Sequence, residues 1–212
     1  MMHNRKAYKP KQRNSKKRTP KRILLIKAEG KNKTEINYFK NFESDTIHVI
    51  QVKGNETDPE NMMRQLINQY NTDDLGDNDL AVCLVDADFN FSKDAQLKKA
   101  DKLIPKEKSI KLIVSNPCFE LWFICHFIYT TRNYTSSDDV LKLLKNSIPD
   151  YEKNSLTVFD NLKKNGDQNK AINNAKKLEK HCLDNNQQPH TVGFSPSTEV
   201  YKIFTDFLLK SS

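Results

Sequence analysis

Five acidic side chains of this sequence stand where an apolar segment gives way to a turn or to the start of a helix. They form a set of carboxylates alone, and hard oxygen ligands of this kind suit Mg²⁺ or Mn²⁺. An ion held by such a set would clamp phosphate oxygens and activate water, either singly or as a two-metal pair. The five candidates are Glu29, Glu35, Asp86, Asp88 and Glu120.

Three of these acids are predicted to end neighbouring strands. Asp86 and Asp88 follow the apolar run LAVCLV at 80–85. Residues two apart in an extended segment face the same way, so both carboxylates can converge on one cation. Glu29 follows another apolar run, and ligands of α/β folds gather at the carboxyl ends of strands. These three are the expected metal ligands, and the other two acids are candidates for a second ion or for general base catalysis.

A structural explanation of the same acids stays open. Two aspartates near a strand end are common turn formers. Ser115-Asn116-Pro117 is a good signal for the start of a helix, so Glu120 could simply belong to the first turn of that helix. Asn116 would then cap the helix, although it could also orient a ligand. The stretch GKNKT at 30–34 lacks the first glycine of a phosphate-binding loop, and that interpretation is rejected.

Basic residues are concentrated at the amino terminus. The chain has 35 Lys and Arg against 27 Asp and Glu, a net charge of +8. Eight of the basic residues and none of the acidic ones fall in residues 1–20, so the remaining 21–212 is neutral. We expect a disordered tail at 1–20 and one domain at 21–212. The tail would either hold phosphates through sequence-independent electrostatics or only add solubility.

Single lysines near the expected strand ends could stabilise the negative charge that develops on a phosphate. Lys31, Lys33 and Lys93 are the candidates, and a solvated surface charge is the alternative for each. The four cysteines show no C-x-x-C spacing, so we expect reduced core thiols. The chain lacks the apolar core of a secretory signal, and its longest apolar run, Leu121–Tyr129, is too short to span a bilayer. A cytoplasmic location without membrane contact is expected.

The elements that must position the acids alternate along the first half of the chain. Apolar or β-branched runs predict strands, and spaced apolar residues behind capping signals predict helices. The order β-α-β-α-β-α-β predicts an α/β fold with a mostly parallel, four-stranded sheet flanked by helices and a helical carboxyl-terminal half. The expected strands are 21–28, 47–53, 80–85 and 110–114, and the expected helices are 34–42, 59–70, 94–104, 118–127, 138–145, 170–182 and 198–209.

The chain resembles a known family in several of these segments. A glutamate that ends the first strand, with D-x-D after the third, resembles the pattern of Toprim domains. The fuller resemblance, over roughly residues 22–209, is to the RloB-like family, which includes the second protein of the AbiL abortive-infection pair. The segments that carry it are AEGKNKTEINYF, the turn from Gly54 to Asp58-Pro59, LVDADFN, IKLIVSNPCFELWFICHF, NKAINNAKKLEK and SPSTEVYKIF, of which SNPCFELW is the most specific.

This resemblance implies a Toprim-like, Mg²⁺-dependent nuclease in anti-phage defence, working beside a separately encoded ATPase of the ABC/SMC-like or AAA class. It implies RNA or DNA as the substrate, with tRNA one target class, and leaves a homo-oligomer open. Glu29, Asp86 and Asp88 match the metal ligands of the pattern. Many relatives have the second glutamate five residues after the first, whereas Glu35 lies six residues after Glu29, which puts its ligand role in doubt.

Rival functions of other classes remain. A non-catalytic nucleic-acid-binding or adaptor subunit of the ATPase complex would keep its function after Asp86→Ala. An enzyme that uses the same metal site on a small nucleotide would act on mononucleotides and not on polymers. A subunit that only anchors or inhibits the ATPase would damage neither RNA nor DNA when released.

Overall fold

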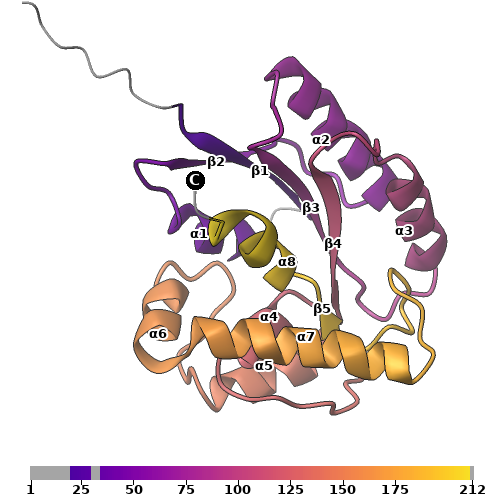
Figure 1. Ribbon diagram of the computed structural model, residues 1–212. Helices are drawn as coiled ribbons and strands as arrows, with labels where there is room; N and C mark the ends of the chain where they lie inside the picture. The colour runs from indigo at the N-terminus through magenta and orange to yellow at the C-terminus, as the bar shows by residue number, and fades with distance from the viewer. Residues whose placement is uncertain (1–19, 30–33, 211–212) are drawn as a thin grey trace, which may run out of the picture.

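The computed structural model describes residues 20–29 and 34–210, and it is built around one five-stranded sheet (Figure 1). The strand order is β2-β1-β3-β4-β5. The first four strands run parallel, as predicted, but the predicted number of four strands is wrong, because β5 pairs antiparallel with β4. The strands are β1 (Arg22–Ala28), β2 (Ile47–Gln51), β3 (Leu80–Asp86), β4 (Ile110–Asn116) and β5 (Ser197–Thr198). Residues 1–19 of the expected tail, and Lys31 and Lys33, lie outside the described residues.

The central strands are apolar on both faces because helices cover both faces of the sheet. Alternate residues of β1 therefore enter different cores. Leu24 and Ile26 pack into the core shared with the carboxyl-terminal helices, whereas Leu25 packs into the core under α2 and α3. Cys83 of β3 lies in that second core, and all four cysteines are buried and free, as predicted.

Helices form two groups around the sheet. Figure 1 shows α2 and α3 together beside the sheet, and α4 to α7 gathered in the lower part of the view, where β4 ends. This arrangement confirms helix-flanked strands and a helical carboxyl-terminal half. The helices are α1 (Thr34–Lys40), α2 (Pro59–Thr72), α3 (Lys93–Lys102), α4 (Glu120–Cys125), α5 (Ser137–Lys145), α6 (Val158–Asn165), α7 (Gln168–Asp184), α8 (Tyr201–Ile203) and the π-helical turn η1 (Phe204–Leu208).

Side-chain caps fix the starts of three of these helices. The Asp58 carboxylate accepts a hydrogen bond from the Asn61 amide at the start of α2, where Pro59 occupies the first helical position. This confirms the predicted Asp-Pro signal. Ser136 and Asp167 cap α5 and α7 in the same way. None of the described helices is long and apolar enough to cross a membrane.

The predictions fail where tertiary pairing decides the local structure. The predicted terminal helix at 198–209 is wrong at its start, because Ser197 and Thr198 extend the sheet beside β4 and the helix begins at Tyr201. Helix α6 was not predicted. The Ser-Asn-Pro signal is also misassigned: Ser115 and Asn116 end β4, and the Ser115 hydroxyl hydrogen-bonds that of Thr198 (2.9 Å).

A buried glutamate anchors β5 to the rest of the sheet. Glu199 accepts hydrogen bonds from the Val114 amide (3.0 Å) and, through the same oxygen, pairs with His190 Nε2 (3.0 Å). Lys202 donates to its other oxygen at 2.5 Å. Burial alone would raise the pKa of Glu199, but the His190 and Lys202 contacts prevail and lower it to about 2. The ionised carboxylate therefore holds the edge strand and α8 on β4.

Candidate functional site

Two parallel neighbours, β1 and β3, bring the first two acids together. Their register pairs Ala28 with Leu84, so Glu29, which follows β1, and Asp86, the last residue of β3, meet at the carboxyl edge of the sheet. The Asp86 amide donates to Glu29 Oε2 at 3.3 Å. The two residues therefore lie together, as the strand-end geometry predicts.

Asp88 joins the cluster by a different route from the one predicted. The D-x-D segment is not extended: Asp88 and Phe89 have φ angles of 50° and 53°, in the left-handed region that costs free energy for non-glycine residues. Main-chain hydrogen bonds hold this turn, from the Ala87 amide to Ser115 O and from the Asp88 amide to Pro117 O. The turn leaves the Asp88 side chain 46% exposed.

Lys93, the first residue of α3, lies among these acids. Its ammonium donates to Glu29 Oε1 (2.8 Å), to the Asp86 carbonyl (2.7 Å) and to Asp88 Oδ2 (3.1 Å). Burial alone would lower the pKa of Lys93, but the hydrogen bond and charge of Glu29, with the charge of Asp88, raise it. These contacts place Lys93 at the strand-end face, as expected. The raised pKa keeps its ammonium fully charged at neutral pH.

Glu35 on α1 and Glu120 on α4 complete the cluster from the helical side. Both are buried, with 7% and 3% of their surface exposed. Tyr151 donates to Glu120 Oε1 (3.0 Å), and Lys153 Nζ lies 4.0 Å from the same oxygen. Glu35 Oε2 has no hydrogen-bond partner within the described chain. Burial, with the negative charge of Glu120, raises the pKa of Glu35 to about 7.

Asp86 is the electrostatic centre of the site. Burial is the largest cause that raises its pKa well above the ordinary 3.8, and neighbouring negative charges add to it. Those charges belong to the four other predicted acids, so all five carboxylates lie within electrostatic reach of one point. The four are Glu35, Glu120, Asp88 and Glu29. A cluster with this excess of negative charge favours a bound cation.

The donor chemistry fits Mg²⁺ or Mn²⁺, since all candidate ligands are carboxylate oxygens and one of them, Glu35 Oε2, is buried without a partner in the described chain. Within residues 20–29 and 34–210, no three or more Asp, Glu, His or Cys side chains are arranged to hold a metal ion. The place where three oxygens do converge is taken by Lys93 Nζ. A cation at this position requires the Lys93 ammonium to withdraw.

The sequence did not indicate Tyr151, Lys153 or Ser137, although each touches a predicted acid. Ser137 Oγ donates to Asp88 Oδ1 at 3.3 Å. These residues come from loops and from a helix start far along the chain, and no spacing pattern links them to the acids. The predicted capping role of Asn116 is wrong, because its Nδ2 donates to the Val192 carbonyl (2.8 Å).

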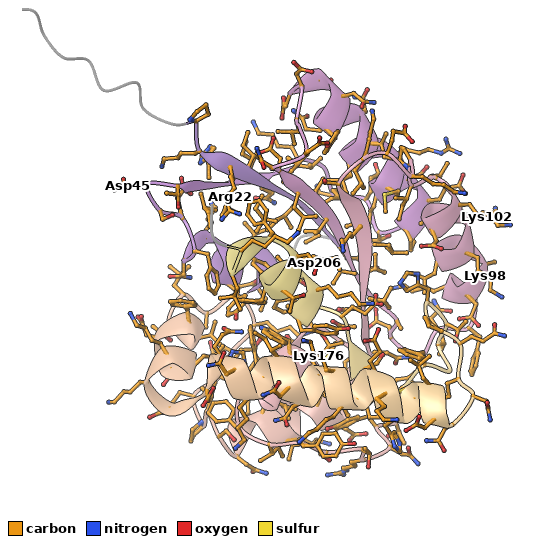
Figure 2. All side chains as sticks on the ribbon, in the orientation of Figure 1. Arg22, Asp45, Lys98, Lys102, Lys176 and Asp206 are labelled. Carbon is orange, nitrogen blue, oxygen red and sulfur yellow. The ribbon has the colours of Figure 1, made fainter. Side chains whose placement is uncertain are left out.

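A large hollow of about 1190 Å³ lies at the opposite end of the strands. Arg22 and Leu80, the first residues of β1 and β3, line it. Arg22, Asp45 and Asp206, labelled in Figure 2, are among the residues that line it. The hollow is separate from the carboxylate cluster, which lies at the carboxyl ends of the strands, where ligands of parallel sheets bind.

The fold and the cluster define an α/β protein with a carboxylate-rich site at the carboxyl edge of a mostly parallel sheet. The model of the RloB-like protein family matches residues 24–206, and the chain belongs to this family. The match includes all five acids. No curated protein and no solved structure matches the chain.

Proposed function

We propose that this chain is a Mg²⁺-dependent, Toprim-like nuclease that hydrolyses phosphodiester bonds of RNA or DNA. The observation that carries the proposal is the grouping of four carboxylates within electrostatic reach of Asp86, whose pKa is raised first by burial and further by these charges. Such a concentration of negative charge destabilises the fold, and strongly perturbed acids of this kind are typical of catalytic sites. Membership of the RloB-like family agrees with this site.

Each acid has a role in the proposed reaction. Glu29, Asp86 and Asp88 hold the ion, which when bound polarises the phosphate and lowers the pKa of water. Glu35, with a pKa of about 7, exchanges a proton near neutral pH and suits a general base or acid. Glu120 is the second candidate for this role, oriented by Tyr151.

The two lysines supply positive charge to the phosphate. Lys93 contacts Glu29 and Asp88, and Lys153 faces Glu120, so the two ammonium groups approach the cluster from different segments. Once released from these carboxylates, Lys93 would be available to a phosphate oxygen. Positive groups placed where negative charge develops stabilise the transition state of phosphoryl transfer.

The biological setting of the proposal rests on the family resemblance. The proposal is that the nuclease acts in anti-phage defence beside a separately encoded ABC/SMC-like or AAA ATPase, with tRNA as one candidate target and the cytoplasm as the place of action.

A non-catalytic nucleic-acid-binding or adaptor subunit is the second candidate. The ion pairs of Lys93 favour it, because they neutralise two acids without a metal. In that case the acids are structural, and their replacement leaves the function intact.

Cleavage assays separate the two candidates. Purified protein is incubated with labelled tRNA and with plasmid DNA, in Mg²⁺, in Mn²⁺ and in EDTA, with and without the neighbouring ATPase. We expect metal-dependent cutting that Asp86→Asn lowers about a hundredfold or more, as loss of a metal ligand does. Asp45→Asn is the matched control, because Asp45 is exposed at the other end of the sheet.

Cutting that survives in Asp86→Asn would exclude this site as its source. Absence of cutting in every condition, together with absence of Mg²⁺ binding in calorimetry, would contradict the nuclease and favour the adaptor.

A further inference from the structure

A groove with lysines along one side adjoins the carboxylate cluster. It has a volume of about 360 Å³, within the range of small-ligand pockets. Helix α5 forms one wall and the segment at 151–153 the other. The lining residues are Asp138, Leu141, Lys142, Lys145, Tyr151, Glu152 and Lys153.

Both segments that form the groove contact acids of the carboxylate cluster. At the start of α5, Ser137 donates to Asp88, and Asp138 is the next residue along. On the opposite wall, Tyr151 and Lys153 line the groove and also face Glu120. The groove and the carboxylate cluster therefore share Tyr151 and Lys153.

On the α5 wall of the groove, the charges change from negative to positive along the helix. Asp138 lies in the first turn of α5, beside the site, whereas Lys142 and Lys145 occupy its last turn. Between Ser137 and Lys145 the helix rises about 12 Å. Lys142 is 80% exposed and 4.0 Å from Asp139, its neighbour on the helix. Its ammonium is therefore open to an anion in solution.

Part of the groove lining is apolar. Leu141 lines the groove on the α5 wall, and Tyr151, which is buried, lines it on the opposite wall. An apolar lining beside ammonium groups matches the two parts of a nucleotide, its base or sugar and its phosphate. Glu152 also lines the groove. The preference of the groove for an anion therefore depends on the lysines.

We infer that this groove binds the strand of nucleic acid next to the bond to be cleaved, with Lys142 and Lys145 on its phosphates. The inference rests on the proposed nuclease function and names the side from which the substrate enters. The groove acts in binding, because these two lysines lie away from the carboxylates. Their replacement therefore weakens affinity and raises KM, while kcat stays near that of the unchanged protein.

The test compares two double variants of equal charge. Lys142→Gln with Lys145→Gln alters the groove, and Lys98→Gln with Lys102→Gln alters exposed lysines of α3, which Figure 2 shows at the edge of the molecule. Binding of a fluorescein-labelled single-stranded oligoribonucleotide and its deoxy counterpart is measured by anisotropy in Ca²⁺ over a range of salt. Thermal unfolding of each variant confirms that it is folded.

We expect the groove variant to bind about tenfold more weakly, with a salt slope lower by about 0.7 for each phosphate that it no longer neutralises, and the α3 variant to be unchanged. Equal binding by the two variants, while the unchanged protein cleaves nucleic acid, would contradict the groove as a binding site but not the nuclease function. Groove-dependent binding without cutting would support the groove and contradict the nuclease. Absence of oligonucleotide binding by the unchanged protein would overturn the groove.

Discussion

At the scale of single residues, Glu35 lowers the stability of the fold that contains it. Its carboxyl binds a proton more tightly in the folded chain than in the unfolded chain, because burial and the charge of Glu120 raise its pKa from 4.5 to about 7. The contribution of this carboxyl to the stability of the fold is therefore fully present below pH 4.5 and is lost as the pH rises through about 7.

Replacement of Glu35 by Gln removes this loss of stability. In EDTA at about pH 8 we expect Glu35→Gln to be more stable than the unchanged protein by about 3 kcal/mol, and at about pH 4 nearly equal to it. Urea unfolding over this pH range measures the difference, with Glu107→Gln, an exposed glutamate, as the control. A constant difference at all pH values would contradict the pKa shift as its cause.

The residues of the site differ in how far the sequence could reveal them. Glu29 and Asp86 were predictable, since each follows an apolar strand and parallel neighbours end at one edge. The position of Asp88 was not, because its left-handed turn depends on main-chain bonds to the segment after β4. Lys153 was not predictable either, since it reaches Glu120 from a loop without periodic spacing.

At the scale of elements, α1 and α4 must keep a fixed position relative to each other, because Glu35 and Glu120 have to lie close together. One buried hydrogen bond joins them: Trp122 Nε1 donates to the Tyr38 hydroxyl at 3.0 Å. Both side chains are almost completely buried, and the Tyr38 ring also packs on Phe119 and Phe123. The aromatic side chains of SNPCFELW therefore form core packing behind Glu120.

Tyr38→Phe keeps the ring and removes the acceptor of this bond. We expect a loss of about 1–2 kcal/mol in the free energy of unfolding, because the indole N–H of Trp122 is left buried without its partner. Chemical denaturation measures the loss. Tyr129→Phe is the control, because Tyr129 is 44% exposed. A change below that of the control would mean that the hydrogen bond does not stabilise the α1–α4 contact.

The elements themselves were predictable in proportion to their local signals. Strands β1 to β4 and helices such as α2 and α7 show apolar runs, periodicity or caps in the sequence. The two-residue β5 shows none of these, because it exists through pairing of Ser197 and Thr198 with β4. Tertiary pairing overrides local preference at such short elements.

At the scale of the whole molecule, the excess of basic residues and the five candidate acids lie in different parts of the chain. Residues 1–20 hold eight basic residues, whereas 21–212 is neutral and contains all five acids. Pro20, the first described residue, lines the hollow at the amino ends of the strands, opposite the carboxylate cluster. The basic segment therefore joins the domain at the end away from the proposed catalytic site.

Deletion of residues 1–20 should consequently change affinity for nucleic acid and not the chemical step. We expect weaker binding, with a salt slope lower by up to about 5 if most of the eight charges contact phosphates of a single strand. In the proposed nuclease KM rises and kcat is unchanged, as both can be measured with the same labelled oligonucleotides. Thermal unfolding should be unaffected, since the deleted segment precedes β1. A fall in kcat at constant KM would instead assign the basic segment a part in the reaction itself.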